Sequence, residues 1–276
     1  MNKILIAEDD SNARDGLSAL LRSGGFAVEV AADGIDALER IQREKFDLLL
    51  VDIWMPRMNG LDLLSRLPKS YRTKIVVMTA DGTTETLLRA LREKAYQYIT
   101  KPFDPKELLA LVRSAVESPM ATDQIQVLSA QPDWVELRFP CDRNIAERIQ
   151  DVVRHLDSDL PSEVRDSVGL AFHELLMNAI EWGGHMNPNS QVQIAYLRTE
   201  RLLLCRIADP GKGFKPSELD HAANENAPDE PIEHTFVREE RGLRPGGFGI
   251  LLAKSLVDEL VYNEAHNEVV MVKYLN

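Results

Sequence analysis

The sequence is poor in cysteine and has no long apolar run. Cys141 and Cys205 are its only two cysteines in 276 residues, and they form no Cys-x-x-Cys pair, so a disulfide framework is not indicated. No apolar run approaches the length of a membrane-spanning helix. Met1-Asn2-Lys3 leads directly into a short strand that ends in acids, which is unlike a signal peptide. We therefore expect a soluble, cytoplasmic protein that does not contact membranes.

An excess of basic residues is also missing. The formal net charge is -12, and residues 1–118 carry 17 Lys and Arg against 18 Asp and Glu, so nearly all of the acidity belongs to the second half. A nucleic-acid-binding output needs a basic face to replace counterions, so we expect no nucleic-acid partner. The sequence has no internal repeat and no low-complexity segment. Its length is enough for about two globular domains.

The stretch from Asp47 to Gly60 indicates a site in the first half. Residues 48–51 form a continuous apolar run, typical of a parallel strand that is covered on both faces. Asp52 ends this strand, and in open α/β sheets ligands bind at the carboxyl ends of the strands. A carboxylate there can act as a nucleophile or a metal ligand. The alternative is a loop aspartate that caps the next helix.

Five strand–helix units follow one another in the first half. The predicted strands are 4–7, 26–30, 48–51, 74–78 and 96–100, and the predicted helices are 12–23, 34–43, 61–67, 84–93 and 105–116. This alternation predicts an α/β fold over residues 1–118, with a doubly wound, five-stranded parallel sheet of the flavodoxin-like class.

Polar side chains follow several of these strands: Glu8, Asp9, Asp52, Thr79 and Lys101. All five can converge on one edge of the sheet. The set fits phosphoryl transfer to a carboxylate, in which the acids hold Mg²⁺, Asp52 attacks phosphorus, and Lys101 and Thr79 stabilise the phosphoryl oxygens. Taken alone, the acids also fit an exposed turn that caps the following helix.

These residues resemble the receiver domain of bacterial two-component response regulators. The matching segments are 6–10, 52–56, 58–60, 79–80 and 101–103, and the resemblance covers residues 2–118. It implies that Asp52 is the phosphoacceptor and that a cognate sensor histidine kinase is a partner.

The resemblance also implies roles for neighbouring residues. The implied Mg²⁺ ligands are Glu8, Asp9, Asp52 and the Trp54 carbonyl. Thr79 and Tyr98 look like the switch pair that reports phosphorylation, although Tyr98 can also be a plain half-buried aromatic. Lys101 would precede a cis-Pro102.

The second half begins after a predicted linker. Residues 119–132 are rich in Pro, Ser, Thr, Ala and Gln with weak periodicity, so the two halves could move independently. For residues 133–276 the predicted strands are 135–139, 191–198, 202–208, 260–263 and 268–274, and the predicted helices are 144–156, 161–182 and 248–259. This pattern suggests an α/β sandwich with a mixed sheet.

Three segments of this half could carry chemistry. Glu174, Asn178 and Glu181 share one face of helix 161–182, although a polar line beside an apolar stripe is usually only the helix boundary. Segment 209–214 follows a strand, and its glycines allow the backbone to approach a ligand. Segment 244–250 is a glycine-rich turn that opens a helix, which can bind an anion. Each signal is weak alone.

In this order and spacing the three segments resemble the Bergerat-type ATP-binding fold of histidine kinases, gyrase-type ATPases and anti-sigma factor serine kinases. The resemblance covers about residues 133–275, and residues 172–183 look like the Asn-containing box of the anti-sigma branch. It implies that Asn178 holds Mg²⁺ against the phosphates of ATP and that Glu174 is the general base. Asp209 would read the adenine amino group. The implied glycine contacts are Gly211 and Gly213 at the adenine pocket and Gly247 and Gly249 at the phosphates.

Two features depart from that branch. Trp182 stands where the branch often has histidine, and residues 215–245 would be an unusually long lid over ATP. The lid ends in a basic segment whose arginines either reach the phosphates or pair with adjacent glutamates: Arg238, Arg241, Arg244, Glu239 and Glu240.

Together the resemblances predict that phosphorylation of Asp52 controls an anti-sigma-type serine/threonine kinase. Its substrate would be a STAS-type anti-anti-sigma protein, so that phosphotransfer frees or traps a sigma factor. The alternative is a non-catalytic module that docks on a sigma factor or STAS protein when Asp52 is phosphorylated. His155 precedes the ATP motifs, as a phosphoacceptor histidine would, but the paired dimerisation helices of histidine kinases are absent, so a surface role is favoured. A homodimer is a further expectation, because related kinases and receivers often dimerise.

Overall fold

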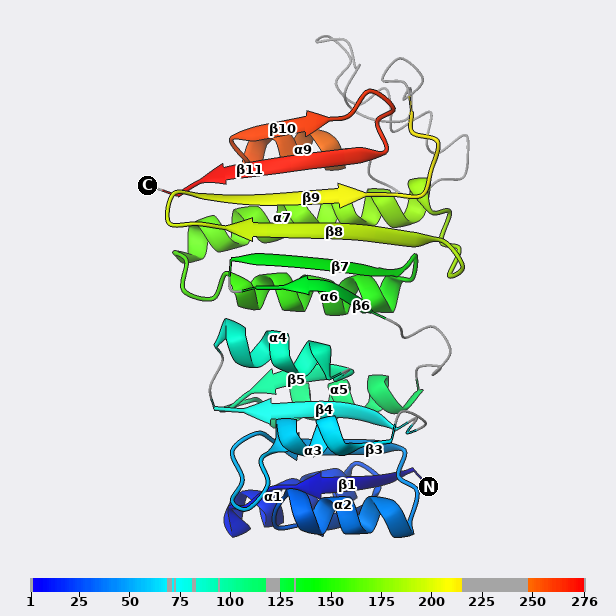
Figure 1. Ribbon diagram of the computed structural model, residues 1–276, viewed down its shortest axis with the longest axis vertical. Helices are drawn as coiled ribbons and strands as arrows, with labels where there is room; N and C mark the ends of the chain where they lie inside the picture. Colours follow the sequence, from blue (N-terminus) through cyan, green and yellow to red (C-terminus); the bar gives the residue numbers. More distant parts are fainter. Residues whose placement is uncertain are drawn as a thin grey trace. The chain divides into compact units, whose positions relative to one another are not determined.

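The protein divides into two compact units, Met1–Asp123 and Gln124–Asn276 (Figure 1). The computed structural model describes residues 2–68, 71, 73–80, 83–93, 95–117, 125–131, 133–214 and 248–275. Within these residues no helix is long and apolar enough to cross a membrane.

A five-stranded parallel sheet forms the centre of the first unit, in the order β2-β1-β3-β4-β5. Its strands are β1 (Lys3–Ala7), β2 (Ala27–Ala31), β3 (Leu48–Asp52), β4 (Lys74–Thr79) and β5 (Gln97–Thr100). The helices are α1 (Ser11–Ser23), α2 (Gly34–Arg43), α3 (Gly60–Arg66), α4 (Thr84–Arg92) and α5 (Pro105–Glu117). The predicted doubly wound, flavodoxin-like sheet is confirmed, and the predicted boundaries differ from the observed ones by at most one residue.

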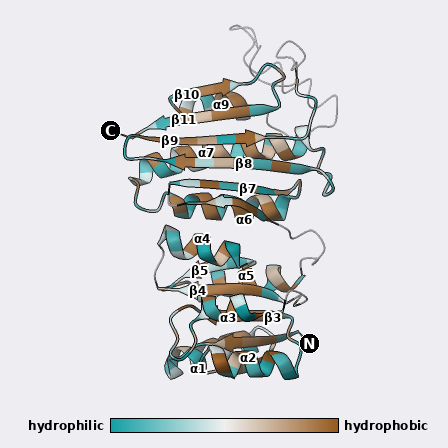
Figure 2. Cartoon of the chain, in the orientation of Figure 1, coloured by the Kyte–Doolittle hydropathy of each residue, from teal (hydrophilic) through white to brown (hydrophobic). Residues whose placement is uncertain are grey.

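The central strands are apolar because helices cover both faces of the sheet. Every residue of β3 and β4 is buried, and Figure 2 shows the hydrophobic character of the sheet's interior. Leu21 of α1 and Leu108 of α5 belong to one apolar cluster that includes residues of β1, β3 and β4. The strand order reverses between β1 and β3. A crevice forms at the carboxyl ends of strands at such a switch point, which makes it the expected ligand site.

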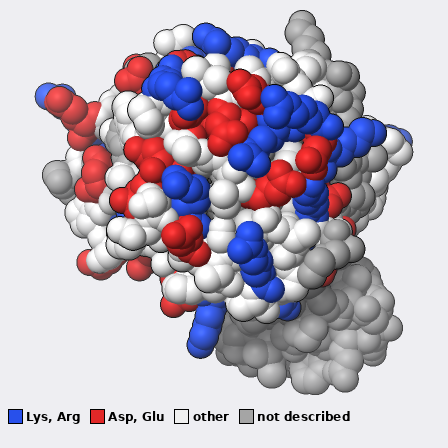
Figure 3. Space-filling model, turned by 90° about the horizontal axis from the view of Figure 1, so that it is seen from below, with Lys and Arg blue, Asp and Glu red and all other residues white. Residues whose placement is uncertain are grey.

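Charged side chains of the first unit are paired on its surface. Lys3 Nζ lies 2.6 Å from Glu29 Oε1, and Arg40 Nε donates a 2.8 Å hydrogen bond to Asp36 Oδ1. Figure 3 shows Lys and Arg side chains intermingled with Asp and Glu over the face that it draws. No single sign of charge dominates that face.

A six-stranded sheet forms the second unit, in the order β10-β11-β9-β8-β7-β6. Its strands are β6 (Gln126–Ala130), β7 (Trp134–Pro140), β8 (Gln191–Arg198), β9 (Leu202–Ala208), β10 (Glu259–Tyr262) and β11 (Glu268–Tyr274). The α-helices α6 (Arg143–Leu156), α7 (Ser162–Asn178) and α9 (Gly249–Leu256) lie on one face of this sheet (Figure 1). The predicted α/β sandwich is confirmed.

The prediction of a mixed sheet was wrong, because all neighbouring strands are antiparallel. The reason lies in the connection between β7 and β8. It consists of two helices, α6 and α7, so the chain reverses three times and enters β8 antiparallel to β7. A single crossover helix would have made these strands parallel.

The predicted linker, residues 119–132, contains a strand. β6 lies inside it and pairs with β7, with Val127 opposite Leu137 and Ala130 opposite Val135. The register shifts between Val127 and Ser129, so the alternation of apolar and polar residues is broken there. This irregularity explains why the sequence pattern did not predict the strand. Residues 118–124 and 132 lie outside the described part of the chain.

The predicted helix 161–182 changes form near its end. α7 ends at Asn178, and Ala179–Gly183 continue as one π-helical turn. Such turns insert an extra residue per turn and are frequent at functional sites. The predicted lid, residues 215–245, and Gly247 lie outside the described residues.

Candidate functional site

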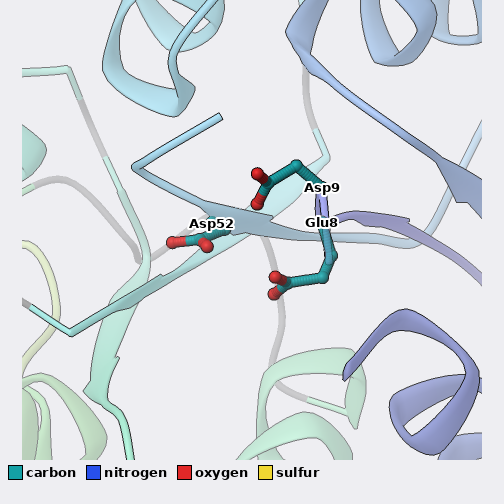
Figure 4. Close-up of side chains that lie close together, drawn as sticks. All are labelled: Glu8, Asp9 and Asp52. Carbon is teal, nitrogen blue, oxygen red and sulfur yellow. The ribbon is translucent and has the colours of Figure 1, made fainter. Parts of the chain in front are cut away.

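An acidic cluster lies at the carboxyl end of the first unit's sheet (Figure 4). Glu8 follows β1 and Asp52 ends β3, on the two sides of the switch point. Carboxylate oxygens of Glu8, Asp9 and Asp52 lie within 4.8 Å of one another. Glu8 and Asp52 are 1% and 6% exposed. Buried carboxylates repel one another at this range, and Mg²⁺ prefers such oxygen ligands, so these residues fit the predicted metal site.

Lys101 joins the two buried acids of this cluster. Its Nζ donates hydrogen bonds to Glu8 Oε2 at 2.7 Å and to Asp52 Oδ2 at 2.8 Å. Burial alone would lower the pKa of the Lys101 ammonium, but its bonds to both carboxylates outweigh burial and raise the pKa. The pKa of Glu8 is raised, chiefly by burial, and the Lys101 bond opposes that shift. Lys101 therefore stays charged beside Asp52, where it can stabilise an added phosphoryl group.

The backbone around Asp52 is shaped by its neighbours. A Cβ atom on Gly60 would overlap the Asp52 carbonyl oxygen, so only glycine fits there. The Trp54 N–H lies 3.3 Å from Asp52 Oδ1, which turns the loop back toward the carboxylate, while the Trp54 side chain is 58% exposed. Thr79 is fully buried at the end of β4, and the Lys101 N–H donates to its carbonyl at 2.7 Å. The Lys101–Pro102 peptide is cis, as predicted.

Tyr98 is buried on β5. Its pairing with Thr79 as a switch, and the Trp54 carbonyl as a metal ligand, stay predictions.

A cavity of about 850 Å³ lies in the second unit between α7, the start of α9 and the sheet. Six of the predicted site residues line it: Glu174, Asn178, Asp209, Gly211, Gly213 and Gly249. Their segments are far apart in the sequence. The structure therefore brings the three predicted motifs together at one site, except for Gly247, which is not described.

Glycines allow the walls of this cavity to approach one another. A Cβ atom on Gly249 would lie 2.5 Å from Glu174 Oε2 and 3.5 Å from Asn178 Nδ2. A Cβ atom on Gly183 would overlap the Asp209 carboxyl group. The π-helical turn after Asn178 thus brings the helix backbone against Asp209. The space and the donor set suit a nucleotide, with glycines where the backbone must approach closely.

Asp209 is held in place by the backbone. Its Oδ1 accepts a 2.7 Å hydrogen bond from the Gly211 N–H, and its own N–H donates to the Asn267 carbonyl at 2.9 Å. Burial raises the pKa of the Asp209 carboxyl, and the Gly211 bond offsets part of that effect. Since Gly211 occupies only Oδ1, the second oxygen can accept from an amino group in the cavity.

Glu181, predicted on one face with Glu174 and Asn178, lies apart from the cavity. It does not line the cavity, and it accepts a 3.1 Å hydrogen bond from Arg143 Nη2. Glu181 belongs to the π-helical turn, whose spacing differs from that of an α-helix. His173 does line the cavity, and its Nδ1 lies 2.9 Å from Gln150 Oε1.

One part of the site was not predicted from the sequence: the hairpin formed by β10 and β11. Tyr262, His266 and Glu268 of this hairpin line the cavity. No local motif marks them, because the hairpin is brought to the site by β-sheet pairing. His155 does not line the cavity, and burial lowers its pKa.

Family models match both units. The model of the response regulator receiver domain matches residues 4–113, and the model of the histidine kinase-like ATPase domain matches residues 142–273. The transcriptional regulatory protein CpxR of Klebsiella pneumoniae is 36% identical over 137 residues, which are 50% of this chain and 59% of CpxR. The DNA-binding response regulator MtrA of Mycobacterium leprae is 38% identical over 112 residues, 41% of this chain and 50% of MtrA.

Among solved structures, the receiver domain of the Francisella response regulator 1452 is similar. It is 30% identical, with a TM-score of 0.41, over 42% of this chain and 98% of that chain. The present chain spans between 50% and 59% of the length of the curated relatives named above. The chain therefore joins a response regulator receiver domain, matched at residues 4–113, to a histidine kinase-like ATPase domain, matched at residues 142–273.

Proposed function

We propose that phosphorylation of Asp52 controls an ATP-dependent serine/threonine kinase in the second domain. The observation that carries this proposal is the convergence of Glu174, Asn178, Asp209 and Gly249 on one cavity of about 850 Å³. The cavity is within the range for small-molecule sites. The proposed substrate is a serine or threonine of a STAS-type anti-anti-sigma protein, and its phosphorylation frees or traps a sigma factor.

In the first domain, the proposed phosphoryl donor is a cognate sensor histidine kinase. An oxygen of Asp52 bonds to phosphorus as the bond to the donor breaks. Glu8, Asp9 and Asp52 hold Mg²⁺, which neutralises charge on the transferred group. Lys101, 2.8 Å from Asp52 Oδ2, can move its hydrogen bond to a phosphoryl oxygen. Thr79 completes this set of donors.

In the second domain, Asp209 orients the adenine of ATP and Asn178 holds Mg²⁺. Bound ATP supplies the γ-phosphoryl group. Glu174 takes the proton of the substrate hydroxyl as the hydroxyl oxygen bonds to the γ-phosphorus, and ADP leaves. Gly249 lies close enough to Glu174 to fix where its carboxylate stands. The start of α9 provides backbone N–H groups toward the phosphates, as helix N-termini commonly do.

The test is transfer of labelled γ-phosphate from Mg·ATP to purified STAS proteins of the source organism, by the full chain with and without acetyl phosphate. We expect the wild type to label one STAS protein and Glu174→Gln to label none. Acetyl phosphate should change the rate of transfer by the wild type but not the rate of transfer by Asp52→Asn. If no STAS protein is labelled at saturating ATP, the kinase proposal fails. Phosphorylation-dependent binding to such a protein without transfer would favour the docking module.

A further inference from the structure

Part of the cavity wall in the second domain is aromatic. Phe214, Tyr262 and His266 line the cavity together with Asp209. The ring centroids of Phe214 lie 5.7 Å from Tyr262 and 5.1 Å from His266, and those of Tyr262 and His266 lie 5.5 Å apart. These separations are typical of contacting rings. The three rings form one cluster, which we call the aromatic wall.

The aromatic wall is tied to the Asp209 turn by the hairpin between β10 and β11. Asn267 accepts from the Asp209 N–H through its carbonyl, and its Nδ2 donates to the Gly211 carbonyl at 3.0 Å. A Cβ atom on Gly213 would overlap the Ala265 carbonyl oxygen, so the turn packs directly on the hairpin. The carboxylate and the rings are thus fixed relative to each other.

The chemistry of Tyr262 matches a site for a neutral, planar group. Burial raises the pKa of its phenol to about 12, and the Asp209 charge contributes to that shift. The ring is therefore uncharged at neutral pH and lies within the electrostatic influence of Asp209. The carboxylate can accept from the polar edge of a nucleobase, while the faces of the base need an apolar partner.

We propose that the aromatic wall stacks the base of the bound nucleotide, which makes Tyr262 and His266 specificity-determining residues. This inference rests on the proposed ATP site and adds to it a second recognition element. Asp209 recognises the edge of the base, and the rings recognise its aromatic face. Stacking on an aromatic side chain contributes enough affinity that removal of one ring weakens binding by about tenfold.

The experiment compares two ligands on the full chain by calorimetric titration. Mg·ATP carries the base, whereas Mg·tripolyphosphate carries only the phosphate chain. Tyr262→Leu removes one ring and keeps an apolar side chain. His266→Asn removes another, and asparagine tolerates the positive φ of 57° at this position. Tyr274→Leu is the matched control, because Tyr274 lies on β11 outside the cavity and is 47% exposed.

We expect Tyr262→Leu and His266→Asn each to weaken ATP binding about tenfold and to leave tripolyphosphate binding within about twofold of wild type. Tyr274→Leu should bind both ligands like wild type. Unchanged ATP affinity in both ring variants, or equal weakening of both ligands, would overturn the proposal. If the wild type binds tripolyphosphate and ATP equally well, base recognition is absent and the proposal fails while a phosphate site remains. If the wild type binds neither, the proposed function itself fails.

Discussion

Gly249, at the start of α9, approaches Glu174 on α7 so closely that a Cβ atom on the glycine would lie 2.5 Å from the carboxylate Oε2. Real Cβ atoms do not come this near to an oxygen, so a side chain at residue 249 must displace the carboxylate. Glu174 Oε2 is the end of a flexible side chain and can move without a change in the backbone. A side chain at residue 249 should therefore change the position of Glu174, the proposed general base, more than it changes the stability of the domain.

Gly249→Ala should remove kinase activity while the domain stays folded. A displaced general base costs at least about 100-fold in rate. The measurement is labelled-phosphate transfer to the proposed STAS substrate, together with thermal unfolding. Gly169→Ala is the matched control, because Gly169 lies on α7 and a Cβ atom there would have open space within 4 Å. It should keep full activity and add about 0.5–1 kcal/mol of stability. Full activity in Gly249→Ala would contradict the role given to Glu174.

Asp9→Asn should slow phosphorylation of Asp52 and raise the magnesium concentration that it requires. The variant removes one of three clustered carboxylates whose oxygens lie within 4.8 Å of one another. With acetyl phosphate as donor and phosphate-affinity electrophoresis as readout, we expect a rate at least about tenfold lower when Mg²⁺ is limiting. A chelator should abolish labelling of the wild type.

The control for this prediction is the adjacent carboxylate. Asp10 caps α1, since its Oδ1 accepts from the Ala13 N–H at 2.8 Å. Asparagine caps helices about as well, so Asp10→Asn should be phosphorylated like wild type. If Asp9→Asn and Asp10→Asn behave alike, the acidic cluster does not hold the metal.

The first domain was predictable because its candidate site residues stand at the ends of short, strongly apolar strands. Glu8 directly follows β1 and Asp52 ends β3, and parallel pairing brings the strand ends to one edge. The fold and the converging acids could therefore both be derived from local patterns. The positions of Lys101 and Thr79 at strand ends followed in the same way.

The second domain was less predictable, because its site depends on contacts between distant segments. Asn267 Nδ2 donates a hydrogen bond to the Gly211 carbonyl, 56 positions away in the sequence, and no local pattern around either residue predicts that bond. Glu181, which the sequence spacing puts on one face with Glu174, lies in the π-helical turn after Asn178 and bonds Arg143 instead of lining the cavity. The register shift in β6 concealed a strand within the predicted linker.

Asp157 should make the stability of the second domain depend on pH. It is 1% exposed, accepts a hydrogen bond from the Tyr196 hydroxyl, and has its pKa raised by burial from 3.8 to about 6. The folded protein thus binds this proton more tightly than the unfolded chain does. Its contribution to stability is fully present below the unfolded value and is lost as the pH rises through about 6.

Between these two pKa values, the free energy of unfolding should fall by up to about 1.4 kcal/mol per pH unit from this group. Asp157→Asn, which keeps an oxygen for Tyr196, should remove that dependence in urea unfolding curves of the second domain. Asp166→Asn is the control, because Asp166 is an exposed aspartate on α7. The same pH dependence in wild type and Asp157→Asn would show that another group is responsible.

Gly183→Ala should weaken nucleotide binding, in contrast to Gly249→Ala. A Cβ atom on Gly183 would overlap the carboxyl group and the Cβ atom of Asp209, so the rigid π-helical turn or the Asp209 turn must move. Asp209 would then no longer face the proposed position of the adenine, and we expect ATP affinity to fall at least about tenfold. Calorimetric titration of Mg·ATP measures this loss, with Gly169→Ala again as the control.

The two glycine variants distinguish ATP binding from phosphoryl transfer at one site. Gly249→Ala displaces Glu174, the proposed general base, and keeps the backbone N–H groups at the start of α9, so it should reduce the transfer rate at saturating ATP more than it reduces ATP affinity. Gly183→Ala displaces Asp209, the residue proposed to recognise the adenine, so saturating ATP should restore most of its transfer rate. If both variants lose ATP affinity and transfer rate to the same extent, Glu174 and Asp209 do not have distinct roles. The assignment of Glu174 as general base and of Asp209 as the residue that recognises the adenine must then be abandoned.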